Sequence, residues 1–263
     1  MNMNNSNEIV MPRVLVISHT PFTSTNSMGS TLASYFVHYN PMCVAQFYIK
    51  DMCPDIPVCY KFFRTTDYDL LSKVKHPFSS SVGRIVELGE ENVASHNNEE
   101  VYAKTFSREF SLVLRDLLWG LRLWNNREFV NWLDEFDPQL VLIQPGDFSY
   151  IIKIALEISK KKNIPLIMHQ SEAYYLKPPA KNTLIYWIYR NHYNHTYEAM
   201  MKRVVCAVYL CDALKNDYQK CFHVPGYTIM KSTQRGHQLM PLPKNRRFIY
   251  GGNIGRRLEE QSL

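Results

Sequence analysis

Polar side chains that could do chemistry follow two apolar runs of strand length. His19 comes shortly after the first run, and His169 ends a later run that is followed by Ser171 and Glu172. A histidine can donate a hydrogen bond to a hydroxyl or a phosphate, and a carboxylate can accept a proton from a hydroxyl. Ordinary roles remain open, because either histidine could bond local backbone and Glu172 could cap a helix or lie on the surface.

The loop that follows the first run is a second candidate. Ligands of open α/β sheets bind beyond the carboxyl ends of the strands, where such loops lie. Gly29 stands where a helix is expected to begin, and free N–H groups there would favour anionic oxygens. We therefore predict that Ser27 and Gly29 contact substrate. An ordinary strand-to-helix turn is the alternative, and no G-x-G-x-x-G fingerprint of a dinucleotide site is present.

Short apolar runs alternate with helical patterns along the chain, and this alternation must position those side chains. The predicted strands are residues 14–17, 44–49, 84–88, 140–143, 166–169, 204–210 and 227–230, and the predicted helices are residues 29–38, 103–124, 127–136, 148–162, 182–203 and 213–221. We expect loops with short elements at residues 50–81. Strands separated by helices indicate βαβ crossovers. The sequence therefore predicts an α/β fold with a Rossmann-like parallel sheet flanked by helices.

Composition narrows the classes of protein. Of the 263 residues, 46% are hydrophobic and 21% are charged, which fits a folded chain, and the formal net charge is +6. This basic excess suits phosphorylated ligands or an anionic membrane surface, but the basic residues are dispersed and we expect no nucleic-acid partner. The six cysteines form no C-x-x-C pair, so we expect reduced thiols and no metal site.

The remaining composition concerns location. Residues 1–8 are polar and lack the apolar segment of a signal peptide, so we expect a disordered tail there. No run of about 18 apolar residues is present that could span a bilayer. We expect a cytoplasmic protein that is free or rests on the inner membrane face.

Two predicted helices carry apolar stripes whose burial the sequence leaves to be tested. In the helix at 103–124, one apolar stripe is predicted to face the core, made of Phe106, Phe110, Val113, Leu114, Leu117, Leu118 and Leu121. The segment 174–203 is the richest in aromatic and basic residues. It either packs a stripe that includes Leu184 and Ile188 against the core or rests on a bilayer interface.

The last residues have a different organisation. Residues 235–245 are turn-rich and are predicted to be a linker, and a strand pattern followed by a glycine-rich turn comes after them. One strand and one turn cannot bury a core, so we expect a second α/β domain to begin here. The predicted divisions are a tail at 1–8, a Rossmann-like domain at 9–243 and the start of another domain at 244–263.

Three passages together resemble one enzyme family. They are RVLVISH (13–19), DPQLVLI (137–143) with IPLIMHQSE (164–172), and FIYGGNIG (248–255). In order and spacing they are similar to the GT-B retaining glycosyltransferases of the family that includes sucrose synthases and many cell-surface polysaccharide enzymes, often called family 4. The resemblance implies an N-terminal, acceptor-side lobe followed by the first elements of a donor-binding lobe.

The resemblance also assigns roles to residues. Many members carry a His-Asp pair just past the strand at 166–169, and an ungapped alignment places Ser171 and Glu172 at those positions. His169 lies two residues too early, which departs from the family pattern. The implied catalytic residues are Glu172 and Ser171, and the implied substrate-binding residues add His169 and His19 to Ser27 and Gly29.

The donor side follows from the same resemblance. The phosphates of a nucleotide sugar would meet the turn at the start of the donor lobe, and the residues implied are Gly252, Asn253, Gly255 and Arg256. The expected partners are a nucleotide-sugar donor, used as a co-substrate with no other cofactor and no metal, and a saccharide or lipid-linked acceptor. The family's donor-site cations lie further downstream, so we expect this chain to be inactive alone. The alternative is a non-catalytic acceptor- or lipid-binding half that pairs with a separate donor-domain chain.

Overall fold

The computed structural model describes residues 11–78, 81–90, 108–178 and 183–231. These residues belong to one compact unit that extends to Lys231, and residues 232–263 lie outside the described part. The predicted tail, the predicted linker and the predicted start of a donor lobe with Gly252, Asn253, Gly255 and Arg256 all lie outside the described residues. The predicted domain boundaries therefore stay a prediction.

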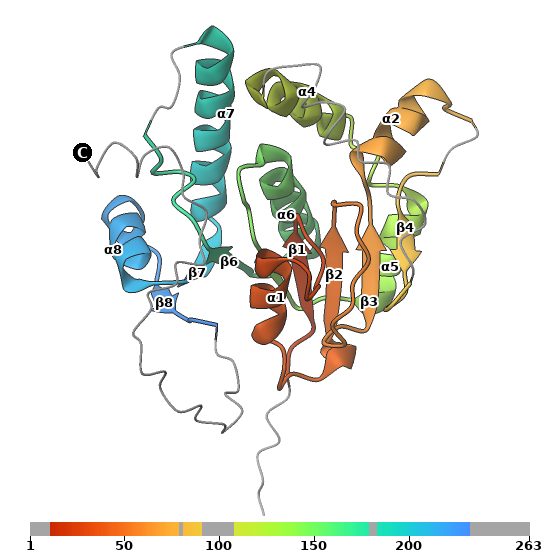
Figure 1. Cartoon of the computed structure of the whole chain (residues 1–263), viewed down its shortest axis with the longest axis horizontal. Helices are drawn as coiled ribbons and strands as arrows, with labels where there is room; N and C mark the ends of the chain where they lie inside the picture. The colour runs from red at the N-terminus through yellow and green to blue at the C-terminus, as the bar shows by residue number, and fades with distance from the viewer. Residues whose placement is uncertain (1–10, 79–80, 91–107, 179–182, 232–263) are drawn as a thin grey trace, which may run out of the picture. The chain divides into compact units, whose positions relative to one another are not determined.

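The described residues form an α/β fold built on one sheet (Figure 1). Its strands are β1 (Val14–Ser18), β2 (Val44–Tyr48), β3 (Lys61–Arg64), β4 (Arg84–Val86), β5 (Leu140–Ile143), β6 (Leu166–Gln170), β7 (Val204–Tyr209) and β8 (Gly226–Thr228). Their order is β4-β3-β2-β1-β5-β6-β7-β8. Every neighbouring pair is parallel except β3 and β4. Without the two edge strands β4 and β8, the remaining six strands have the order β3-β2-β1-β5-β6-β7, which is that of a Rossmann-like doubly wound sheet.

Helices cover both faces of this sheet. They are α1 (Ser27–Ser34), the short 3₁₀ helix η1 (Pro41–Cys43), α2 (Asp67–Lys75), α4 (Arg108–Gly120), α5 (Arg127–Phe136), α6 (Ser149–Lys162), α7 (Leu184–Met201) and α8 (Asp212–Cys221). Side chains alternate along β1, so Val14 and Val16 join a core under α1. Leu15 and Ile17 join the larger core on the other face with α5, α6 and α7. Burial on both faces explains why β1 is continuously apolar.

Local signals fix where several helices begin and end. Asn126 accepts a hydrogen bond from the Phe129 N–H and caps α5, which stops at Asp137 in the left-handed region just ahead of Pro138. Thr66 and Asp69 form a reciprocal capping box at the start of α2. These caps satisfy backbone groups that a helix end leaves without partners.

The first strand is tied to the start of β5 by a side chain at its entrance. The guanidinium of Arg13 donates to the carbonyl of Asp137 at 2.7 Å and to its carboxylate at 2.7 Å. The backbone N–H of Arg13 donates to Oε1 of Gln139 at 2.9 Å. Strands that enter the sheet 126 residues apart are thereby held in register.

The structure refines two predictions about local structure. Residues 50–81, predicted to be loops with short elements, contain the four-residue strand β3 and the nine-residue helix α2. β3 buries only Phe62 and Phe63, so it gives no long apolar run. The stripe predicted along the helix at 103–124 is buried only in part, since Leu118 is buried whereas Phe110, Leu117 and Leu121 are 39%, 65% and 57% exposed. The buried side of α4 carries Trp119 next to Leu118, together with ion pairs described below.

The aromatic helix α7 divides its length between core and solvent. Its second half buries Tyr193, Tyr197 and Met200, as the core-packing alternative predicts. In its first two turns Tyr189 is buried, but the predicted stripe residues Leu184 and Ile188 are 77% and 55% exposed. No helix in the described part of the chain is long and apolar enough to cross a membrane.

Candidate functional site

The connections of the sheet diverge at β1 and β5. The loop after β1 leads to α1 on one face, and the loop after β5 leads to α6 on the other. Such a switch in direction opens a crevice at the carboxyl ends of the two strands, where open α/β sheets bind ligands. Three loops, at residues 19–26, 144–148 and 171–178, meet this edge of the sheet. The candidate site is therefore the switch point between β1 and β5.

His169 lies buried at this edge, near the end of β6, with 1% of its surface exposed. Its Nε2 lies 3.0 Å from the hydroxyl of Tyr35, and that hydroxyl donates to the carbonyl of Ile229 at 3.2 Å. Nε2 must therefore carry the proton, which leaves Nδ1 to accept from the amide of Gln144 at 3.5 Å. Burial lowers the pKa of His169 to about 4, so the imidazole is neutral near pH 7.

Gln144 follows β5 directly and supplies an acceptor at the same point. Its side chain is 2% exposed, and its Oε1 has no hydrogen-bond partner among the described residues. A buried amide oxygen of this kind normally accepts a hydrogen bond. It is therefore an open acceptor within the buried group that Gln144 forms with His169.

His19 is positioned by stacking. Its ring lies flat against the ring of Phe148, with centroids 4.7 Å apart and planes at 13°. Phe148 belongs to the loop after β5, so the contact joins the two loops of the switch point. The guanidinium carbon of Arg115 lies 5.1 Å from the centroid of the Phe148 ring. Arg115 is itself ion-paired with the carboxylate of Asp67 at 2.7 Å.

The loop after β1 is anchored by a carboxylate that the sequence analysis did not single out. Asp55 accepts from the N–H and the hydroxyl of Ser24, both at 2.7 Å, and from the hydroxyl of Thr23 at 3.1 Å. Asp55 lies in residues 50–81, which were predicted to be loops with short elements, and nothing in its local pattern marks it as a partner of the loop after β1. These hydrogen bonds to a single carboxylate fix the conformation of the loop at Thr23 and Ser24.

The two predicted residues of this loop have different environments. Ser27 is the first residue of α1 and is exposed. Gly29 is buried, and its N–H donates to Oδ1 of Asn26 at 3.3 Å, so it is not the free donor that the sequence suggested. A Cβ at Gly29 would lie 2.2 Å from the carbonyl oxygen of Pro21. Its structural role is close packing of the helix against the loop.

We expect Gly29→Ala to lower the free energy of unfolding by about 1–3 kcal/mol, because the added methyl group meets backbone that cannot rotate away. Gly120→Ala is the matched control, since a Cβ at that helical position meets nothing within 4 Å. It should leave stability unchanged or raise it by up to about 1 kcal/mol. Urea denaturation of both variants measures this, and equal midpoints would contradict the assignment.

Ser171 and Glu172 follow His169 at the same edge. Ser171 is half-buried and Glu172 is exposed. Their backbone is held by buried Gln170, whose amide donates to the carbonyl of Glu172 and to the hydroxyl of Tyr218. The hydroxyl of Tyr197 donates to Oε1 of Gln170 at 3.1 Å. The pair is thus presented to solvent on a fixed support, as a hydroxyl and a carboxylate that could contact a ligand.

The structure brings some of the predicted residues together and adds others. His169, Gln144 and Tyr35 form one hydrogen-bonded group, and His19 joins Phe148. Gln144, Tyr35 and Phe148 were missed by the sequence analysis. The position of Gln144 directly after an apolar strand is a signal that could have found it, whereas the contact of Tyr35 depends on the fold.

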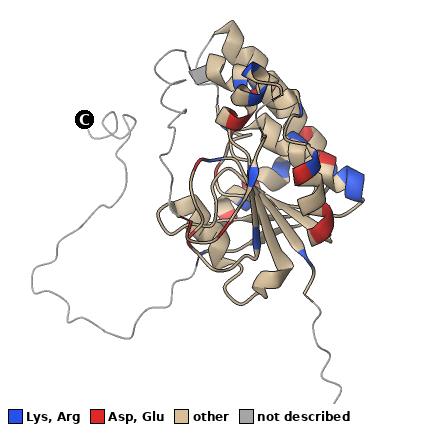
Figure 2. Cartoon of the chain, turned by 90° about the vertical axis from the view of Figure 1, so that its right-hand side faces the viewer, with Lys and Arg blue, Asp and Glu red and all other residues tan. Residues whose placement is uncertain are grey.

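Metal and disulfide chemistry find no support in the described residues. No group of three or more His, Cys, Asp or Glu side chains there could hold a metal ion, and the six cysteines are unpaired. His192, three residues from His195, lies 3.0 Å from the carboxylate of Asp116 instead. Basic and acidic residues lie interspersed on the side of the molecule shown in Figure 2.

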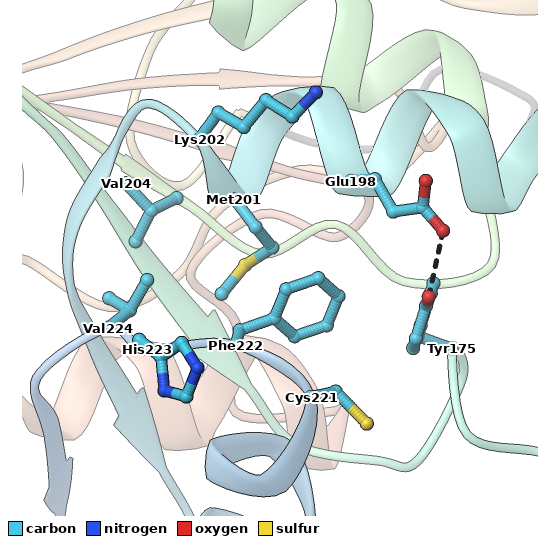
Figure 3. A pocket seen from close by; sticks show the side chains of 9 residues that line it. All are labelled: Tyr175, Glu198, Met201, Lys202, Val204, Cys221, Phe222, His223 and Val224. Carbon is cyan, nitrogen blue, oxygen red and sulfur yellow. Dashed lines mark hydrogen bonds between the residues drawn. The ribbon is translucent and has the colours of Figure 1, made fainter.

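A hollow of about 580 Å³ lies elsewhere, where the C-terminal ends of α7 and α8 meet (Figure 3). The hydroxyl of Tyr175 donates to the carboxylate of Glu198 at 2.9 Å on one side of it. Met201 and Phe222 contribute apolar surface, and Cys221 presents an exposed thiol. None of the predicted site residues lines this hollow, and Tyr175 is its one lining residue from the loop at 171–178.

Comparison with known proteins gave no match, either to a family model or to a curated protein.

Proposed function

We propose that the chain is the acceptor-side lobe of a GT-B glycosyltransferase that transfers a sugar from a nucleotide-sugar donor to a saccharide or lipid-linked acceptor. The observation that carries the proposal is the β1–β5 switch point of a Rossmann-like sheet, where the hydrogen-bonding side chains of Gln144, His169 and Tyr35 meet. The resemblance of residues 13–19, 137–143 and 164–172 to that family supports the same reading.

The side chains at the switch point suit an acceptor rich in hydroxyl groups. The exposed carboxylate of Glu172 accepts a proton from the hydroxyl that attacks. Ser171 offers a hydroxyl beside it. His169 stays neutral, so it helps to position Gln144 without placing a charge next to the sugar.

Retaining transfer asks little of side chains at the reacting carbon. It requires that the acceptor hydroxyl is oriented and that the departing diphosphate is stabilised. In this proposal the acceptor hydroxyl is oriented by His19, His169, Ser171 and Glu172. Ser27 and Gly29, in the first turn of α1, lie near them in the proposed site. The departing diphosphate is stabilised by Gly252, Asn253, Gly255 and Arg256 together with the rest of a donor lobe.

We expect residues 1–263 alone to give no labelled product with a panel of radiolabelled nucleotide sugars and mixed saccharide and lipid-linked acceptors. A polypeptide that continues with a complete donor lobe should transfer label, and Glu172→Gln in it should lower the rate by about 10²-fold or more. His223→Gln is the control, because this exposed histidine lies away from the switch point.

The outcomes separate the candidates. Turnover by residues 1–263 alone would contradict the proposal that a donor lobe is needed to stabilise the departing diphosphate. An unchanged rate in Glu172→Gln would remove Glu172 from the mechanism. Acceptor binding without transfer in any longer polypeptide would favour the non-catalytic acceptor-binding half, which pairs with a separate donor-domain chain.

A further inference from the structure

The segment that follows β8 lies against α1 near the switch point. We call residues 229–231 the strap, because they come directly after β8 and end the compact unit at Lys231. The side chains of Ile229 and Met230 are 43% and 73% exposed, and Lys231 is exposed as well. These side chains contribute little apolar burial, so the position of the strap depends mainly on hydrogen bonds.

The end of β8 separates a fixed part of the chain from the strap. The hydroxyl of Thr228 donates to the carboxylate of Asp212 at 2.6 Å, which ties the last residue of β8 to the start of α8. The N–H of Ile229 donates to the carbonyl of Tyr209 at the end of β7, at 2.9 Å. The next two hydrogen bonds of the strap cross to the other side and join it to α1.

The first of these two bonds also involves the candidate site. Tyr35 caps the C-terminal end of α1, and its hydroxyl donates to the carbonyl of Ile229 at 3.2 Å. The same oxygen lies 3.0 Å from Nε2 of His169, and the two rings meet edge-on with centroids 5.3 Å apart. Burial raises the pKa of Tyr35 to about 12, so the phenol keeps the proton that it donates. One hydroxyl therefore joins the strap to a buried imidazole.

The second bond comes from the far end of the strap. The Nζ of Lys231 donates to the hydroxyl of Ser30 at 2.6 Å, in the first half of α1. Both bonds to α1 are open to solvent, so water can replace each of them at a small cost in free energy. The strap can therefore leave α1 while β8 stays paired with β7.

The bond between Tyr35 and His169 couples the strap to the switch point. His169 and Gln144 are 1% and 2% exposed, although they lie at the edge of the sheet where open α/β sheets bind ligands. A ligand oxygen that accepts from Nε2 of His169 must take the place of the Tyr35 hydroxyl. That displacement also removes the donor to the carbonyl of Ile229, so access to His169 and release of the strap favour one another.

We propose that Tyr35 latches the strap over His169, and that opening of this latch uncovers the imidazole for a ligand at the switch point. In the closed state one phenol bonds both the strap and His169. In the open state β8 keeps its place and residues 229–231 move away from α1. The inference goes beyond the proposed function, since it concerns access to the site and holds for any ligand with an acceptor oxygen.

The variant Tyr35→Phe tests the latch, because it removes the shared hydroxyl and keeps the ring. In the full chain the amide of Ile229 should exchange with deuterium about three- to tenfold faster, the change expected when one hydrogen bond is lost. Diethyl pyrocarbonate acylates neutral imidazoles that solvent can reach, and it should modify His169 faster by a similar factor. Mass spectrometry of peptides measures both rates, with the exposed His223 as the internal reference for the reagent.

Tyr39→Phe is the matched control. The Tyr39 hydroxyl donates to the carbonyl of Pro12 at 2.6 Å, so this variant loses one hydroxyl hydrogen bond just after α1 without touching the strap. It should leave the exchange of Ile229 and the modification of His169 unchanged. A second variant, Ser30→Ala, removes the acceptor of Lys231 at a solvent-exposed bond. It should speed exchange at Ile229 by about two- to threefold.

Three results would overturn the latch. The first is equal exchange at Ile229 in Tyr35→Phe and Tyr39→Phe. The second is an equal rise in exchange at the amides of β1, since the hydroxyl would then support the whole fold. The third is unchanged modification of His169 despite faster exchange at Ile229, which would show that the strap does not cover the imidazole. None of these measurements needs a nucleotide sugar or an acceptor, so a failure of glycosyl transfer leaves this test intact.

Discussion

Asp67→Ala is expected to lower the free energy of unfolding by about 3–5 kcal/mol, the range for removing one partner of a buried charge pair. The Asp67 side chain is 8% exposed, and its carboxylate accepts from the indole N–H of Trp119 at 2.7 Å and pairs with Arg115 at 2.7 Å. The substitution removes the acceptor of the buried Trp119 indole N–H and the carboxylate that pairs with Arg115. Urea denaturation at neutral pH measures the loss.

The same substitution should reach the candidate site. Arg115 lies over Phe148, and Phe148 stacks on His19, so Asp67 supports the loop of the switch point through two contacts. Asp134→Ala is the control, because Asp134 forms a surface pair with Lys162 and is 56% exposed. It should cost about 0–1 kcal/mol. Similar losses in the two variants would show that the buried network carries no special weight.

His169 should make the protein lose stability as the medium becomes acidic. Burial lowers the pKa of its imidazole from 6.5 to about 4 in the folded state. Above pH 6.5 the neutral imidazole costs the folded state nothing. Between pH 6.5 and about 4 only the unfolded chain takes up the proton, so the free energy of unfolding falls as the pH is lowered through this range. The expected loss is about 3 kcal/mol.

Unfolding in urea between pH 7 and pH 4 tests this, with His169→Gln as the informative variant. That variant should be less stable at pH 7 but should lack most of the pH-dependent loss. His223→Gln changes an exposed histidine and should keep the full slope. The carboxylate of Asp116 adds a separate loss at lower pH. Burial raises its pKa, but hydrogen bonds from His192, Lys153 and Ser149 outweigh this and lower it to about 2.

The elements that were predicted correctly are those with a clear local signal, either a continuous apolar run or a helix cap and stop. β1 and β5 lie between two layers of helices, so their residues are apolar without alternation. α5 has both a cap at Asn126 and a stop before Pro138. β3 has neither feature, since Lys61 and Arg64 flank two phenylalanines, and its place in the sheet comes from its neighbour β2.

The candidate site could be predicted only in part for a similar reason. His19 and His169 were found because each follows an apolar run, and strand ends are positions that sequence can locate. Tyr35 contacts His169 across 134 residues, and nothing in its local pattern distinguishes it from other helix tyrosines. The predicted stripe of α4 is buried only in part, because half-buried charges such as Asp116 and Arg115 look like surface residues in a sequence.

The position of β1 has a consequence for how the chain acquires its structure during synthesis. β1 pairs with β2 on one side and with β5 on the other, and Arg13 bonds Asp137 and Gln139 at the entrance of β5. A nascent chain that has emerged only as far as α5 therefore holds its central strand with one edge open. Contacts this distant in sequence form late and slowly, so the protein depends on protection of that edge until residue 143 has left the ribosome.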